Sequence, residues 1–333
     1  MKILFDRPLP FFLAHGGLQT QIEQTRHALL RLGVEVEWMR WWDETVVGDI
    51  IHYFGRPSPA YVEFAHARGV KIVIAELLTG LGSRGALARR LQSAVIRALR
   101  PNPFFDRMGW ASYQLADAAV ALTAWEAQLM HEVLGAPAER VHVVPNGVEE
   151  VFLQCPPGAE RGRWLVCTAT IAPRKRVVEL AAAAVLAGTP VWILGRPYAE
   201  DDEYARQFRE LCAAHPDLLR YEGSVADRAQ LAGIYAAARG FVLLSTEESL
   251  SLSALEAAAC GCPLLLSDLP WARTTCGSAA QYCPMAAAAA TAPVLRAFYD
   301  GAPGMPRPPR PASWDEVGAQ LREFYAGLLK TSR

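Results

Sequence analysis

The stretch GFVLLSTEESLSLSALEAAACGCP, residues 240–263, decides the fold. Residues 240–245 form a short and almost wholly apolar run, which predicts a buried strand, and residues 254–260 predict a helix that ends at Gly261. Two carboxylates stand eight positions apart, Glu248 on the loop between strand and helix and Glu256 in the first helical turn. In an open parallel sheet this loop lies at the carboxyl edge of the strands, where ligands bind.

Glu256 also has a purely structural interpretation. Ser253 and Glu256 have the spacing of a capping box, in which a Ser and the Glu three residues later bond to backbone N–H groups at the helix start. The spacing alone leaves both roles open.

Alternating strand and helix patterns extend from this stretch over the whole chain. Strands are predicted in two series of six, at 2–5, 34–38, 49–54, 70–74, 118–122 and 141–144, and then at 164–168, 191–194, 218–221, 240–245, 263–267 and 280–283. Strands separated by helices imply crossover connections and parallel sheets. We therefore predict two doubly wound α/β domains, residues 1–150 and 151–310. Residues 311–333 carry apolar positions at helical spacing and predict a final amphipathic helix.

The composition limits the classes of function that this chain can have. The net charge of -1 over 333 residues gives no general affinity for nucleic acid. The seven cysteines lack C-x-x-C pairs and zinc-site spacing. The first apolar run is too short for a secretory signal, and no run approaches the roughly 20 residues of a membrane span. We expect a cytoplasmic protein without a metal and without a nucleic-acid partner.

Two further motifs follow predicted strands. Gly16 and Gly17 open the first helix, where the backbone can approach a ligand and helix N–H groups favour phosphate, although a simple tight turn is the alternative. Arg174, Lys175 and Arg176 follow the first strand of the second series. Such a cation cluster suits a diphosphate, and a solvated basic turn is its alternative.

In this order, the motifs resemble the retaining glycosyltransferases of family 4, whose signature is Glu, seven residues, Glu. The resemblance covers nearly the whole chain and is strongest from about 140 to 275. It implies the GT-B fold, which is two Rossmann-like domains with an interdomain cleft. The first domain would face the acceptor, the second would bind a nucleotide sugar, and the final helix would pack back on the first domain.

The resemblance also implies roles for residues. Glu248 would hold hydroxyls of the donor sugar, Glu256 would hold the ribose, and Lys175 with Arg174 would hold the diphosphate. Ionised carboxylates accept hydrogen bonds, so they suit paired hydroxyl donors. The other donor-binding residues implied are Gly16, Gly17, Gly195, Arg196, Ser224, Val225, Ser249, Leu250, Ser251, Leu252 and Ser253.

The implied reaction transfers a sugar from a nucleoside diphosphate sugar to a hydroxyl acceptor, which would be a glycan, a lipid-linked molecule or a small molecule. We expect UDP or GDP as the nucleotide and no required cofactor. A GT-B sugar-nucleotide epimerase or phosphorylase and a non-catalytic nucleotide-sugar-binding partner remain alternatives.

Two positions depart from the family pattern. Thr170 stands where relatives carry an Arg, so either Arg174 or Arg176 supplies that charge or diphosphate binding is weaker. Glu76 follows a strand after which many relatives present a His to the donor sugar. Glu76 takes that catalytic place, recognises the acceptor, or is structural.

The segment 84–107 is the most basic part of the first half, with five arginines before the aromatic pair at 104–105. A basic helix flanked by aromatic residues is compatible with peripheral contact with anionic lipid, whereas a solvated helix face is the alternative. The sequence predicts no oligomeric state.

Overall fold

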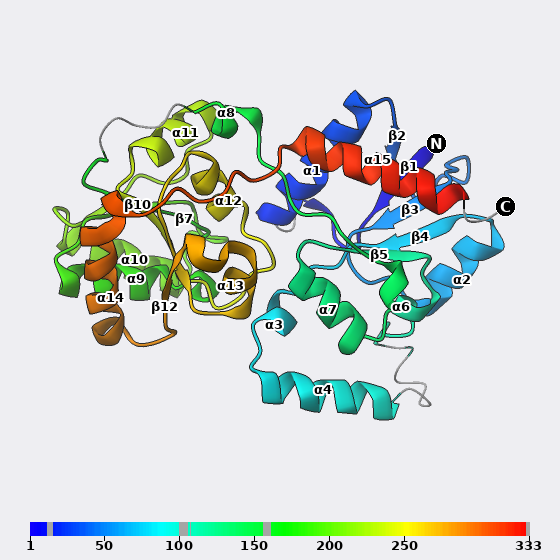
Figure 1. The fold of residues 1–333 in the computed structure, drawn as a ribbon, viewed down its shortest axis with the longest axis horizontal. Helices are drawn as coiled ribbons and strands as arrows, with labels where there is room; N and C mark the ends of the chain where they lie inside the picture. The colour runs from blue at the N-terminus through cyan, green and yellow to red at the C-terminus, as the bar shows by residue number, and fades with distance from the viewer. Residues whose placement is uncertain (12–15, 100–105, 107, 156–160, 331–333) are drawn as a thin grey trace. The chain divides into compact units, whose positions relative to one another are not determined.

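The chain folds into two compact units. The computed structural model describes residues 1–11, 16–99, 106, 108–155 and 161–330. Unit 1 comprises Met1–Asn146 and Trp314–Arg333, and unit 2 comprises Gly147–Ser313 (Figure 1). Among the described residues, no helix is both long and apolar enough to cross a membrane.

Unit 1 is built on a six-stranded parallel sheet of order β2-β1-β3-β4-β5-β6. Every residue of β3 and β5 is buried, which explains why these segments, apart from His52, are apolar with little alternation. The strands are β1 (Lys2–Asp6), β2 (Glu35–Trp38), β3 (Ile50–Tyr53), β4 (Lys71–Ile74), β5 (Ala118–Ala121) and β6 (Val141–Val143). The helices are α1 (Gly17–Arg31), α2 (Pro59–Ala67), α3 (Thr79–Gly82), α4 (Ala86–Leu99), α6 (Ser112–Leu115), α7 (Ala124–Glu132), the 3-10 turn η2 (Ala138–Arg140) and α15 (Trp314–Lys330).

The last helix of the chain belongs to unit 1. α15 lies against α1 (Figure 1), with Trp314, Val317 and Leu321 buried. A Cβ on Gly318 would stand 2.9 Å from the Cβ of Ala28, so the absence of a side chain lets the two helices approach closely.

Unit 2 also has a six-stranded parallel sheet, of order β12-β11-β10-β7-β8-β9. Its strands are β7 (Leu165–Thr168), β8 (Val191–Leu194), β9 (Leu219–Tyr221), β10 (Gly240–Leu243), β11 (Leu264–Ser267) and β12 (Gln281–Cys283). Its helices are α8 (Glu150–Leu153), α9 (Val177–Ala187), α10 (Glu203–Ala214), α11 (Arg228–Ala237), α12 (Leu252–Ala259), α13 (Pro270–Cys276) and α14 (Ala288–Gly301), with the 3-10 turns η3 (Pro173–Lys175), η4 (Gly277–Ala279) and η5 (Ala302–Gly304).

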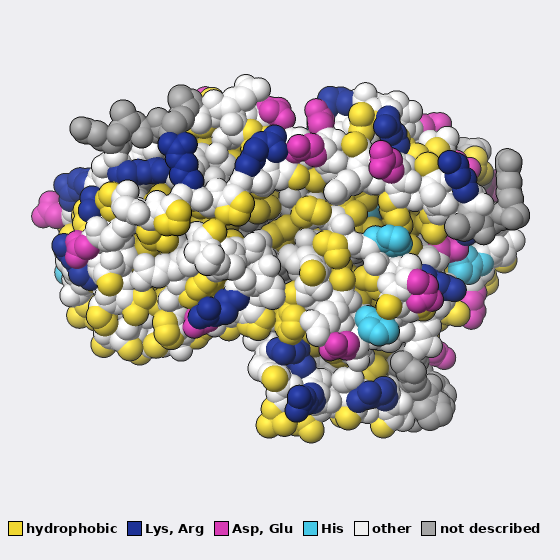
Figure 2. Space-filling view, viewed as in Figure 1, with side chains coloured by type: hydrophobic (Ala, Val, Ile, Leu, Met, Phe, Trp, Pro, Cys, Tyr) yellow, Lys and Arg dark blue, Asp and Glu magenta, His cyan; other side chains and the backbone are white. Residues whose placement is uncertain are grey.

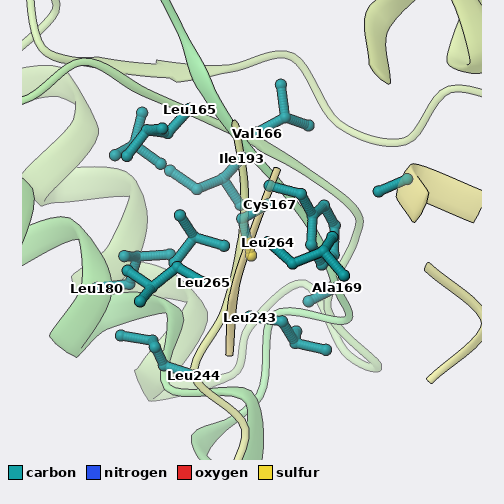
Figure 3. Packing of buried hydrophobic residues seen from close by; sticks show 14 of the residues in the cluster. Leu165, Val166, Cys167, Ala169, Leu180, Ile193, Leu243, Leu244, Leu264 and Leu265 are labelled. Atoms are coloured by element: carbon teal, nitrogen blue, oxygen red, sulfur yellow. The ribbon is translucent and has the colours of Figure 1, made fainter. Parts of the chain in front are cut away.

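The core of unit 2 surrounds its central strands. Figure 3 shows side chains of β7, β8, β10 and β11 packed together, among them Leu165, Ile193 and Leu265, which are fully buried. Helix α9 adds Leu180 to this core. Because both faces of the sheet are covered, the strands show no polar alternation, as in the run at 240–245.

The predicted fold class, two doubly wound parallel sheets, is confirmed. Each predicted strand is present, with ends that differ by at most two residues. The segment 149–160, which spans the predicted boundary between the two domains, contains α8, whose Phe152 is fully buried in the core of unit 2. Residues 156–160 of that segment and the aromatic pair at 104–105 lie outside the described residues.

Candidate functional site

The site in unit 2 lies at the point where the order in which strands are added to the sheet reverses. Counted from β7, the strand order is 3-2-1-4-5-6, so β7 and β10 are neighbours whose connections lead to opposite sides. Ligands of open α/β sheets bind at the carboxyl ends of two such strands. The loops after β7 and β10 are joined there, because the Thr246 backbone N–H donates to the Arg174 carbonyl at 2.8 Å.

Lys175 and Glu248 come together on these two loops. The Nζ of Lys175 donates to Oε1 of Glu248, and the two side chains are only 12% and 11% exposed. Removal of one partner from a buried ion pair of this kind strongly destabilises the protein, because the other charge then stays buried without a counter-charge. The two residues that the sequence placed 73 positions apart therefore form one unit at the sheet edge.

The capping-box interpretation of Glu256 is wrong. Helix α12 begins at Leu252, and its N-cap is Ser251, whose Oγ accepts from the Ala254 backbone N–H at 3.4 Å. Glu256 therefore lies one turn inside the helix, too far along to bond to its start. Ser253 instead lies beside the cap, with its Oγ 3.2 Å from that of Ser251.

Glu256 forms an ion pair with an arginine that no sequence motif indicated. Arg228, at the start of α11, donates to Glu256 Oε1 and, at 2.5 Å, to Glu149 Oε2. The Arg228 guanidinium also lies over the Phe152 ring, 4.7 Å from its centroid. Arg228 and Glu149 are distant from the motif in sequence, and neither has a spacing that marks it.

Burial determines the ionisation of Glu256, which is 6% exposed. Loss of hydration raises the pKa of its carboxyl to about 7, and the nearby Glu149 adds to this rise. The Arg228 guanidinium and the Tyr235 hydroxyl oppose the rise by favouring the carboxylate. At neutral pH the acceptor capacity of Glu256 therefore depends on Arg228.

Backbone hydrogen bonds join the carboxyl ends of β7, β8 and β9. Gly195 donates its N–H to the Gly223 carbonyl at 3.0 Å, and the Ala169 N–H donates to Leu194 at 2.9 Å. A Cβ on Gly195 would stand 1.8 Å from the Ala169 carbonyl oxygen, and its φ is +151°. Only glycine fits this position.

The remaining donor-site candidates of unit 2 lie around the same edge. Ser249, Leu250 and Ser251 are buried in the loop before α12, and Leu252 is half-buried at the start of that helix. Arg196 and Ser224 are exposed on the loops after β8 and β9, and Val225 packs partly against the core.

The arginines beside Lys175 differ in their contacts. Arg176 has φ +53°, the only positive φ of a non-glycine residue among the described residues, and its guanidinium contacts the Ala286 carbonyl. Arg174 is half-buried, with Nη2 3.4 Å from the Tyr198 hydroxyl. Arg174 is therefore the better candidate for the charge that Thr170 does not supply.

Unit 1 contains the other predicted residues. Glu76, after β4, accepts two hydrogen bonds from Arg56, both at 2.8 Å, and one from the Tyr113 hydroxyl at 2.6 Å. Gly16, the N-cap of α1, and Gly17 are exposed, and His15 lies outside the described residues. Both Glu76 oxygens are thus engaged within unit 1. Among the described residues, no group of three or more His, Cys, Asp or Glu could hold a metal ion.

Two parts of the chain match glycosyl transferase families. Residues 162–296 match the family "Glycosyl transferases group 1", and residues 40–147 match the "Glycosyl transferase 4-like domain". The predicted resemblance of the chain to the family 4 glycosyltransferases is thereby confirmed.

Two curated relatives are D-inositol 3-phosphate glycosyltransferases. The protein from Thermobispora bispora is 32% identical over 196 residues, which cover 53% of this chain and 46% of the relative. The one from Geodermatophilus obscurus is 36% identical over 179 residues, 48% of this chain and 40% of the relative. The chain thus matches rather less than half the length of these relatives.

Solved structures show the same fold over the whole chain. A sucrose-phosphate synthase from Thermosynechococcus elongatus has a TM-score of 0.67 and 16% identity and covers 100% of both chains. Anabaena HepE, solved in complex with UDP and glucose, has a TM-score of 0.65 and 13% identity, with 98% of this chain and 99% of that one covered. The two parallel sheets therefore form the GT-B fold.

Proposed function

We propose that the chain is a retaining glycosyltransferase that moves a sugar from a nucleoside diphosphate sugar to an acceptor hydroxyl. The observation that carries the proposal is the pairing of both motif carboxylates with cations, Glu248 with Lys175 and Glu256 with Arg228, beside the switch point of unit 2. Unit 2 would bind the donor and unit 1 the acceptor.

The chemistry of each group fits a part of the donor. The Glu248 carboxylate would accept hydrogen bonds from sugar hydroxyls, and Glu256 would accept them from the ribose. The diphosphate would compete with Glu248 for Lys175 and would gain charge-assisted hydrogen bonds. Arg174 would add a second cation, and the first backbone N–H groups of α12, near Leu252 and Ser253, suit an anion.

These cations would also promote the reaction. As the bond between sugar and diphosphate breaks, negative charge grows on the leaving phosphate, and fixed positive groups stabilise that charge more in the transition state than before it. We assign no residue as general base, because the leaving phosphate can itself take the acceptor's proton. UDP is the first nucleotide to test, because the structure of HepE is described as a complex with UDP.

A thermal-shift assay with UDP, GDP, ADP and their sugars tests donor binding. One nucleotide class should raise the melting temperature by about 3–6 °C at roughly tenfold excess over Kd. Glu256→Ala should abolish this shift. Glu247→Ala is the matched control, because Glu247 is exposed on the same loop, and it should leave the shift intact.

Transfer itself requires product analysis. Incubation with the donor and candidate acceptors should yield a glycoside whose anomeric configuration, read by NMR, is that of the donor. An inverted product would contradict retention, and absence of any nucleotide-induced shift would sink the donor-site proposal. Nucleotide-sugar binding without turnover on any acceptor would favour the non-catalytic alternative, which is motivated by the departures from the family pattern at Thr170 and Glu76.

A further inference from the structure

Helix α4 exposes its apolar side. Leu87, Leu91 and Val95 follow one another at intervals of four residues, so they form a stripe on one face of the helix. Their exposed fractions are 73%, 60% and 54%. Figure 2 shows hydrophobic side chains beside basic ones on the surface at α4, which Figure 1 draws at the bottom of the view, away from the sheet of unit 1.

The opposite face of α4 fixes the helix to unit 1. Ile96 is 1% exposed and belongs to the unit 1 core. The Ser93 hydroxyl donates to the Glu132 carbonyl at 3.0 Å, and the Arg89 guanidinium lies 4.4 Å from the centre of the Trp125 ring. These contacts fix which side of α4 faces unit 1, so the apolar stripe on the opposite side is held at the surface.

The charge on α4 has a single sign. Residues 84–99 contain four arginines and no acidic residue. Arg90 and Arg97 are exposed and lie two helical turns apart, on a row next to the apolar stripe. An exposed apolar stripe with adjacent arginines has the composition of a helix that lies in the interface of an anionic bilayer.

We propose that α4 is a membrane-docking helix that inserts Leu87, Leu91 and Val95 among the lipids of an anionic membrane surface while Arg90 and Arg97 bind the headgroups. A second copy of the chain suits this face less well, because pairing two such helices would bring arginines of like charge together. The proposal does not depend on the transferase activity.

Sedimentation of the full chain with vesicles tests docking. Wild type should pellet with phosphatidylcholine vesicles that contain roughly 30 mol % phosphatidylglycerol and should bind pure phosphatidylcholine several-fold more weakly. Leu87→Ser/Leu91→Ser should weaken binding by about tenfold or more. Arg90→Gln/Arg97→Gln should remove most of the preference for the anionic lipid and its dependence on salt.

The control tests whether any exposed apolar residue would have the same effect. Phe64 on α2 and Leu186 on α9 are 73% and 63% exposed, so Phe64→Ser/Leu186→Ser should bind vesicles as wild type does. Unchanged melting temperatures would show that all variants fold. Failure of wild type to bind, or equal binding by all variants, would overturn the proposal. A dimer in size-exclusion chromatography that Leu87→Ser/Leu91→Ser dissociates, without vesicle binding, would assign the stripe to self-association instead.

Discussion

Arg228 contacts two carboxylates, and one of them belongs to the sequence motif. Glu256 is buried, and burial raises the pKa of its carboxyl to about 7 from an ordinary value of 4.5. Because the folded protein binds this proton more tightly than the unfolded chain, the contribution of Glu256 to stability is greatest at low pH. That contribution decreases as the pH rises from about 4.5 to about 7. Ligand binding would have the opposite pH dependence, because the proposed role of Glu256 needs its carboxylate.

Nucleotide affinity should therefore fall as the pH is lowered through about 7, where Glu256 becomes protonated. Arg228→Met removes the cation that favours the carboxylate, so the midpoint of this fall should move upwards by about 1 in pH. Arg228→Lys keeps the charge and should give an intermediate midpoint. Calorimetric Kd values between about pH 5.5 and pH 8.5 measure this shift.

The control for Arg228 is Arg206→Met. Arg206 forms an exposed ion pair with Glu203 on α10, so its loss should not move the midpoint. An Arg228→Met variant with the wild-type midpoint would show that Arg228 does not control Glu256.

The sequence predicted only part of this site. Glu248, Glu256 and Lys175 stood out because the spacing and order of their motifs resemble a known family. Arg228 and Glu149 did not, because they meet Glu256 only after α8, α11 and α12 pack together. The capping box failed for a related reason: Ser251 and Ser253 both suit an N-cap, and which one is used depends on where the loop after β10 ends.

In unit 2, the close approach of the carboxyl ends of β7, β8 and β9 depends on one glycine. Gly195 donates its N–H to the Gly223 carbonyl after β9, and a Cβ on Gly195 would meet the Ala169 backbone after β7 rather than a flexible side chain. The loop cannot relieve that contact without moving away from the end of β7, which leads into the loop of Lys175.

Gly195→Ala should lower the free energy of unfolding by about 2–4 kcal/mol and weaken nucleotide binding. Gly188→Ala is the comparison. Gly188 has φ +59° and no neighbouring atom within 4 Å of a Cβ. The substitution should therefore lower the free energy of unfolding by only about 1 kcal/mol and leave nucleotide binding unchanged. Chemical denaturation and the thermal-shift assay give the two readouts. Equal effects of the two substitutions would refute the steric argument.

Across the whole molecule, the sequence predicted which segments are strands but not their order. Apolar runs separated by helices were enough to predict six strands in each half. The orders β2-β1-β3-β4-β5-β6 and β12-β11-β10-β7-β8-β9 depend on which side of each sheet a crossover takes, which no local pattern records. The return of α15 to unit 1 came from the family resemblance, and its physical basis is the close contact of Gly318 with α1.

That contact allows the two units to be perturbed separately. A Cβ on Gly318 would stand 2.9 Å from the Cβ of Ala28 and 3.2 Å from its backbone carbon, so Gly318→Ala must push α15 away from α1. We expect unit 1 to lose about 1–3 kcal/mol of stability, as in other overpacked cores. Hydrogen exchange should become faster in α1 and the neighbouring strands β1 and β2, whereas unit 2 and its nucleotide response should not change.

Gly327 provides the control on the same helix. It has no atom within 4 Å of a Cβ, so Gly327→Ala should gain about 0.5–1 kcal/mol from helix propensity alone. Opposite signs for the two substitutions would separate packing from propensity. If Gly318→Ala also accelerated exchange throughout unit 2, the two units would unfold as one, and the contacts of α15 with unit 1 would contribute to the stability of the whole chain.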